Sequence, residues 1–142
     1  PTGTGAGAEH STGTAAGAER FAGTGARALR PATPPADFDL DQALSSLRRF
    51  RDRRPAGIAL AHYGLVPDPV AILDEAESAL RRWAEVAEAA WRAGADVASA
   101  LQGAFAADWA DLDGDERRRL ETLNGVHSNA AGLTQWLERT GT

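Results

Sequence analysis

The sequence contains no cysteine and no methionine, and all 15 of its basic residues are arginine. Without cysteine the chain has neither a disulfide framework nor a thiolate metal site. No apolar run approaches the roughly 18–20 residues that a membrane-spanning helix needs, and no charged-then-apolar leader is visible. These absences favour a soluble protein of the reducing cytoplasm that does not bind membranes.

An excess of positive charge is also missing, since the formal net charge is −5. Nucleic-acid binding depends on basic residues gathered on one face, so nucleic acid is not an expected partner. One local basic cluster remains, at the end of an expected helix, where cations interact favourably with the helix dipole. Two roles are therefore considered for this cluster: stabilisation of the helix end and binding of an anion. The cluster consists of Arg48, Arg49, Arg51, Arg53 and Arg54.

Large apolar side chains are scarce in residues 1–36, where Phe21 and Leu29 are the only ones among Gly, Ala, Thr and Pro. This low-complexity segment and connector should bury little surface. Its glycines do not predict a phosphate-binding loop, because the lysine, strand and helix that such loops require are absent. We therefore expect the core to come from a helix and strand in residues 37–64 and from a helical region in residues 65–142.

Residues 37–142 show a helical pattern broken by one short apolar run. The run Gly57–His62 is typical of a buried strand, which needs hydrogen-bonding partners and so implies further strands. The sequence thus predicts a mostly α protein with four helices and one short strand. The four helices start at N-cap residues Asp39, Asp68, Asp96 and Asp113, and their apolar positions extend to Phe50, Ala90, Trp109 and Leu137.

The residue types best suited to chemistry are few. His62 ends the expected strand, where a histidine can serve as a metal ligand or as a hydrogen-bonded structural residue. A catalytic zinc needs about three protein ligands, and His62 has no visible partners. His127 lies on an expected helix and should have a packing or surface role, while His10 is assigned none. Core or interface packing is favoured over ligand binding for the tryptophans, which are Trp83, Trp91, Trp109 and Trp136.

Three stretches carry a resemblance to a known family: Arg30–Leu40, Ser46–Leu47 and Gly57–Gly64. They resemble the carboxyl part of bacterial metallo-β-lactamase-fold hydrolases of the glyoxalase-II-like branch, and the resemblance covers residues 26–142. It implies an αββα sandwich with a helical extension and two metal ions, usually zinc. In an Ala-His-Tyr-Gly context, His62 would then be the last metal ligand.

The resemblance also implies that residues 69–138 form a helical layer over the entrance for a small-molecule substrate. The family's His-x-His-x-Asp-His motif is absent, and Thr14 stands in a segment resembling that of the family's metal-bridging aspartate. Two hypotheses follow. The chain is the carboxyl-terminal part of a metal-dependent hydrolase and is inactive alone, or it is a non-catalytic helical module that associates through its tryptophan-bearing faces, with itself or with another chain.

Overall fold

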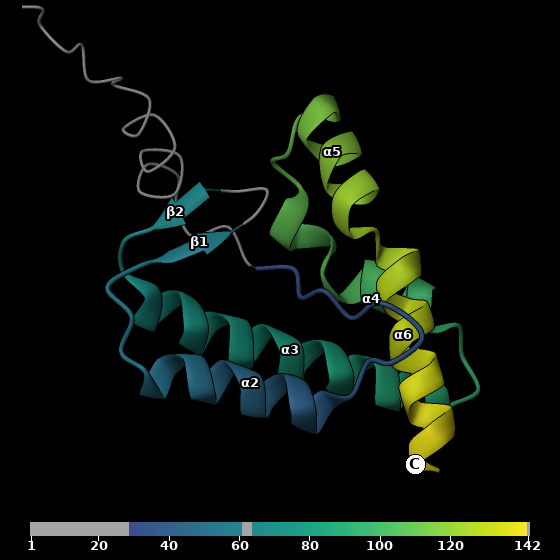
Figure 1. The fold of residues 1–142 in the computed structure, drawn as a ribbon. Helices are drawn as coiled ribbons and strands as arrows, with labels where there is room; N and C mark the ends of the chain where they lie inside the picture. The colour runs from purple at the N-terminus through teal and green to yellow at the C-terminus, as the bar shows by residue number, and fades with distance from the viewer. Residues whose placement is uncertain (1–28, 61–63, 142) are drawn as a thin grey trace, which may run out of the picture.

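The computed structural model describes residues 29–60 and 64–141. These residues form five α-helices, one 3₁₀ helix and a two-stranded antiparallel sheet (Figure 1). The prediction of a mostly helical chain is confirmed, and no sandwich is present among the described residues. In chain order the elements are α2 Leu40–Asp52, β1 Ile58–Leu60, β2 Gly64–Val66, α3 Pro69–Arg92, α4 Val97–Ala104, η1 Ala106–Trp109, α5 Gly114–Asn124 and α6 Val126–Thr140.

Helices α2 and α3 lie side by side as an antiparallel pair (Figure 1). Helix α2 begins as predicted, because the Asp39 carboxylate accepts a hydrogen bond from the Gln42 backbone N–H. Asp68 precedes α3 but makes no capping hydrogen bond, and Pro69 lies in the first turn, where it costs no backbone hydrogen bond. With 24 residues, α3 is about 36 Å long and packs against α2, α4 and α6.

Ion pairs lie along the contact between α2 and α3, some of them between the helices and one, Arg81 with Glu77, within α3. The carboxylate of Glu77 accepts hydrogen bonds from Arg81 at 2.8 Å and from Arg48 at 3.1 Å, and Arg51 pairs with Asp74 at 2.7 Å. The hydrogen bonds from Arg81, and next from Arg48, lower the pKa of Glu77. Two members of the basic cluster therefore have structural partners on α3.

A Glu77→Gln substitution is expected to reduce the pH dependence of stability. Because the folded-state pKa of Glu77 is lowered, its carboxylate stabilises the fold above the unfolded-state pKa of about 4.3 and loses this effect as the pH falls through the folded value. The stability difference between the wild-type chain and Glu77→Gln should therefore be largest near neutral pH and shrink below about pH 4. Urea titrations at several pH values measure it, and a difference that grows on acidification would contradict the prediction.

The apolar core joins α3, α4, η1 and α6, and two tryptophans lie inside it. The ring of Trp83, which is 1% exposed, stacks on Phe105 with centroids 5.2 Å apart, and it lies 6.0 Å from the ring of Trp109. Trp91 and Trp136 are half-buried against the same core. Trp83 and Trp109 therefore have the core-packing role that the sequence favours for the tryptophans.

Two of the four predicted helices are each divided in the structure. The segment predicted to run from Asp96 to Trp109 forms α4 and the 3₁₀ helix η1, with Phe105 between them. The segment that begins after Asp113 breaks at Gly125, which has extended backbone angles (φ −67°, ψ 143°) and separates α5 from α6. A Cβ at Gly125 would lie 2.8 Å from the Glu121 carbonyl oxygen, so glycine permits this close approach.

The predicted strand has its partner within the chain. Strand β1 pairs with β2 in an antiparallel register that places Ile58 opposite Val66 and Leu60 opposite Gly64. Gly64 has a φ of +88°, a conformation that glycine adopts without strain, where the second strand begins. Strand β2 therefore supplies a hydrogen-bonding partner that the sequence analysis did not identify, and the expectation of strands beyond this hairpin stays a prediction. Among the described residues, however, the outer edges of both strands have no strand partner.

Candidate functional site

The candidate metal ligand His62 lies between the two strands in sequence. Strand β1 ends at Leu60 and β2 begins at Gly64, and residues 61–63 are outside the part of the chain that the structure describes. The interpretation of His62 as a metal ligand or as a structural residue therefore remains a prediction. His10 and Thr14 also lie outside the described residues.

The one described histidine, His127, is exposed in the first turn of α6. It lies on the walls of two surface depressions, of about 440 and 420 Å³. The pKa of the neighbouring Asp96 carboxyl is lowered, chiefly by hydrogen bonds from Ser99 and to a smaller extent by the charge of His127. Within residues 29–60 and 64–141, no three His, Asp or Glu side chains are grouped so as to hold a metal ion. The described residues therefore do not fit a zinc site on their own.

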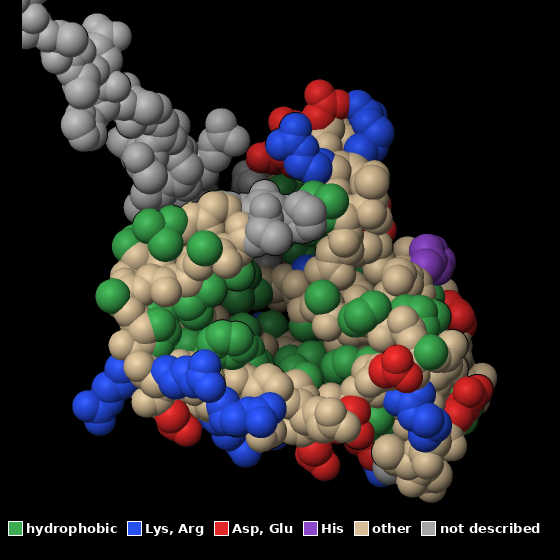
Figure 2. Space-filling model, in the orientation of Figure 1, with side chains coloured by type: hydrophobic (Ala, Val, Ile, Leu, Met, Phe, Trp, Pro, Cys, Tyr) green, Lys and Arg blue, Asp and Glu red, His purple; other side chains and the backbone are tan. Residues whose placement is uncertain are grey.

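Apolar side chains are exposed where α2 ends, the hairpin folds and α3 begins. Phe50, Leu65 and Val70 are 54%, 49% and 50% exposed, respectively. Figure 1 places the elements that carry them at the same end of the molecule, and Figure 2 shows apolar surface gathered there beside arginines. We call these three residues the hairpin end. Leu65 belongs to β2, whose outer edge has no strand partner among the described residues, so this end combines two features of a surface that contacts another element.

A second site was missed by the sequence reasoning. Residues 29–38, which we call the strap, precede α2 as an irregular segment with a turn at residues 35–37, and they touch α3, α5 and α6. The backbone N–H of Leu29 donates to Glu75 in α3 at 3.2 Å. Thr33 is 0% exposed, a buried position that the composition of residues 1–36 did not predict, whereas Ala32, Pro34, Pro35 and Ala36 are exposed.

Two asparagines bind the main chain of the strap. The Thr33 backbone N–H donates to Asn129 Oδ1 at 2.7 Å, and the Thr33 hydroxyl donates to the Asn129 carbonyl oxygen at 3.0 Å. Asn124 Nδ2 donates to the carbonyl oxygens of Arg30 and Pro31 at 3.1 and 3.2 Å. The asparagines are joined to each other, because Asn129 Nδ2 donates to Asn124 Oδ1 at 2.6 Å. This network, which is buried at Thr33 and Asn129, supplies partners for main-chain groups that an irregular segment leaves free.

The rest of the strap is held by a glycine and an arginine of α6. A Cβ at Gly132 would lie 1.9 Å from the Thr33 carbonyl oxygen, so the strap and the helix backbone can be this close only at a glycine. Arg139 donates to the carbonyl oxygens of Ala36 and Phe38 at 2.7 and 2.5 Å. The signals available in the sequence were Asn129 and Gly132, which interrupt the apolar pattern of an expected helix.

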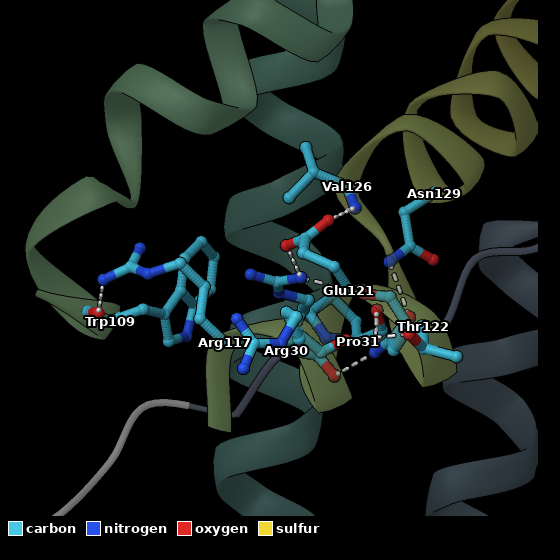
Figure 3. A network of polar contacts seen from close by, with 10 residues as sticks. Arg30, Pro31, Trp109, Arg117, Glu121, Thr122, Val126 and Asn129 are labelled. Carbon is cyan, nitrogen blue, oxygen red and sulfur yellow. Dashed lines mark hydrogen bonds and ion pairs between the residues drawn. The ribbon is translucent and has the colours of Figure 1, made fainter. Parts of the chain in front are cut away.

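The strap also places one arginine side chain under α5 (Figure 3). The Arg30 guanidinium lies 4.0 Å from the centroid of the Trp109 ring and donates to Glu121 Oε1 at 2.6 Å and to the Asn124 carbonyl oxygen at 2.9 Å. Its side chain is 5% exposed, whereas that of Glu121 is 44% exposed. Arg117 donates to the Trp109 carbonyl oxygen at 3.1 Å, which ties α5 to η1.

The described geometry therefore defines a helical layer that holds the irregular strap and carries a short hairpin. None of the described helices is long and apolar enough to cross a membrane. Comparisons with protein-family models, with curated proteins and with solved structures found no match.

Proposed function

We propose that this chain is the carboxyl-terminal part of a metallo-β-lactamase-fold hydrolase, which supplies His62 as one metal ligand and a helical cover for the substrate entrance. The hairpin end carries this proposal. A two-stranded hairpin is at best marginally stable alone, and its unpaired edges and exposed Leu65 are suited to joining a larger sheet. His62 lies in sequence between the two strands.

The proposal requires metal ligands from outside the described residues. One histidine leaves most coordination positions of a zinc ion without protein ligands. We therefore expect the chain alone to bind zinc weakly and to hydrolyse no ester or thioester. In this proposal, α2 and α3 would hold the hairpin in place, and the strap would hold the helical cover in place.

The decisive experiment is the intact mass of the polypeptide that carries this sequence in its native cells, together with its zinc content. A mass well above the 14.9 kDa of this chain, with bound zinc that is lowered by His62→Ala, would support the proposal. An upstream region without a His/Asp cluster, or zinc content unchanged by His62→Ala, would overturn it. His127→Ala is the matched control, because that histidine is exposed on α6.

The alternative is a non-catalytic helical module that associates with a second copy. The exposed side chains of the hairpin end favour it. The tryptophan faces do not, because Trp83 and Trp109 are buried in the core of the chain itself. Sedimentation of the isolated chain distinguishes the two. Association that is abolished by Leu65→Ser would support the module, and a monomer at all concentrations would exclude self-association.

A further inference from the structure

Helix α5 has little packing of its own to hold it in place. None of its residues is buried, and Leu120 is half-buried against the core. In Figure 1 the helix projects away from the layer formed by α3, α4 and α6. A helix with so few buried apolar contacts belongs to the low-stability end of a fold, where elements open locally while the rest stays folded.

Polar contacts take the place of packing. Asn124 bonds to the strap and to Asn129, Arg117 bonds to the Trp109 carbonyl oxygen, and other contacts converge on Arg30. Its guanidinium contacts Glu121 of α5, the carbonyl oxygen at the end of α5 and the ring of Trp109 in η1. Glu121 Oε2 in turn accepts from the Val126 backbone N–H at 3.3 Å, which connects the same carboxylate to the start of α6 (Figure 3). Arg30 Nε is buried and has no hydrogen-bond partner among the described residues. With α5 in this position, the Arg30 Nε–H is a buried donor without an acceptor in the described part of the chain. This is unfavourable, and contact with water would relieve it.

A glycine lies at each end of α5. Gly114 is its first residue and Gly125 follows its last, and among the described residues a Cβ built at Gly114 would meet only the end of the Arg118 side chain, at the ordinary contact distance of 3.9 Å. At the first turn, Asp113 accepts hydrogen bonds from the N–H groups of Asp115 and Glu116, and Glu116 returns one to Asp113. This capping box is internal to the helix and its start, so it stays intact when α5 leaves the layer.

We propose that α5 is a separately opening arm of the fold and that Arg30 is the latch that holds it closed. The strap carries the latch, so the position of α5 depends on the seating of the strap on α6. Opening frees the Arg30 guanidinium from Glu121 and the Arg117 guanidinium from the Trp109 carbonyl oxygen. This inference concerns the chain itself and does not depend on the proposed hydrolase.

Amide hydrogen exchange of the whole 142-residue chain, followed by mass spectrometry, tests the proposal. In Arg30→Met, the amides of residues 114–124 should exchange at least tenfold faster than in the wild-type chain. The central amides of α3 and α6 should change less than twofold, because those helices keep their core. Glu121→Gln, which removes the charge of the partner but keeps an acceptor, should accelerate the same amides by a smaller factor.

Arg118→Gln is the matched control, because Arg118 lies on α5 but pairs with the exposed Asp115 alone among the described residues. It should leave the exchange of α5 within twofold of the wild-type rate. Equal acceleration of α3, α5 and α6 in Arg30→Met would overturn the proposal, because Arg30 would then contribute only to global stability. Unchanged α5 amides would overturn it as well. If Arg30→Met does not fold, Glu121→Gln decides between the same outcomes.

Discussion

A Gly132→Ala substitution should lower the free energy of unfolding by about 3 kcal/mol, because the added methyl group forces the strap away from α6. The new Cβ would lie 1.9 Å from the Thr33 carbonyl oxygen and 2.8 Å from the Pro34 carbonyl carbon, and both are backbone atoms that cannot rotate away. Urea denaturation followed by far-ultraviolet circular dichroism measures the loss.

Gly103→Ala provides the matched control for this substitution. Gly103 also lies within a helix, α4, but no atom lies within 4 Å of a Cβ built there. Alanine at an open helical position is expected to stabilise the fold by about 0.5–1 kcal/mol. The two Gly→Ala changes should therefore have opposite signs. If both stabilise the chain, the strap does not pack against α6 as described.

An Asn129→Ala substitution should cost about 2–4 kcal/mol, because it leaves buried polar groups without partners. The Thr33 N–H loses its acceptor at 2.7 Å, and Asn124 Oδ1 loses its donor at 2.6 Å. Asn129 is 2% exposed and Thr33 is 0% exposed, so water is poorly placed to replace these bonds. The free energy of unfolding from urea titration gives the cost.

Thr122→Ala is the control for Asn129→Ala. Its hydroxyl donates to the Arg118 carbonyl oxygen from an exposed position on α5, and its removal should change stability by less than about 0.5 kcal/mol. The double substitution of Asn124 and Asn129 to alanine should cost less than the sum of the two single changes, because the asparagines share one network. Additive effects would contradict the coupling of the two residues.

The sequence was sufficient to predict the helices wherever local signals act alone. Asp39 and Asp96 accept hydrogen bonds from N–H groups three residues ahead, as their positions predicted, and Asp113 completes a capping box with Glu116. Caps and apolar periodicity depend on neighbours within one or two turns, so they can be recognised without the rest of the fold. The break at Gly125 was missed because the apolar pattern continues across it.

The strap and the pairing of β1 with β2 could not be predicted from local sequence signals. The strap is set by contacts such as those of Thr33 with Asn129, which are 96 residues apart in sequence. Between Leu29 and Phe38 the strap has no large apolar side chain, so its composition does not predict the burial of Thr33. Asn124 of α5 and Asn129 and Gly132 of α6 supply the contacts that bury it. The pairing of β1 with β2 was missed because each strand has three residues, which is too short to show alternation.

The metal site expected from the sequence and the strap seen in the structure involve different residues. The assignment of His62 and zinc rests on a resemblance, and it stands as a proposal that mass and metal content can test. The contacts of the strap and of Arg30 are seen in the structure, and the latch is inferred from them. Arg30 and Thr33 belong to one of the stretches that carry the resemblance, although the sequence alone gave no role to either side chain.

The way in which α6 and the end of α5 hold the strap has a consequence for sequence divergence. Asn124, Asn129 and Arg139 bind main-chain atoms of the strap, which every amino acid provides. The strap's own sequence can then drift at its exposed positions, such as Ala32 and Ala36, while the residues that receive it stay under selection. Orthologues should accordingly be recognisable by an asparagine and a glycine three residues apart late in the chain.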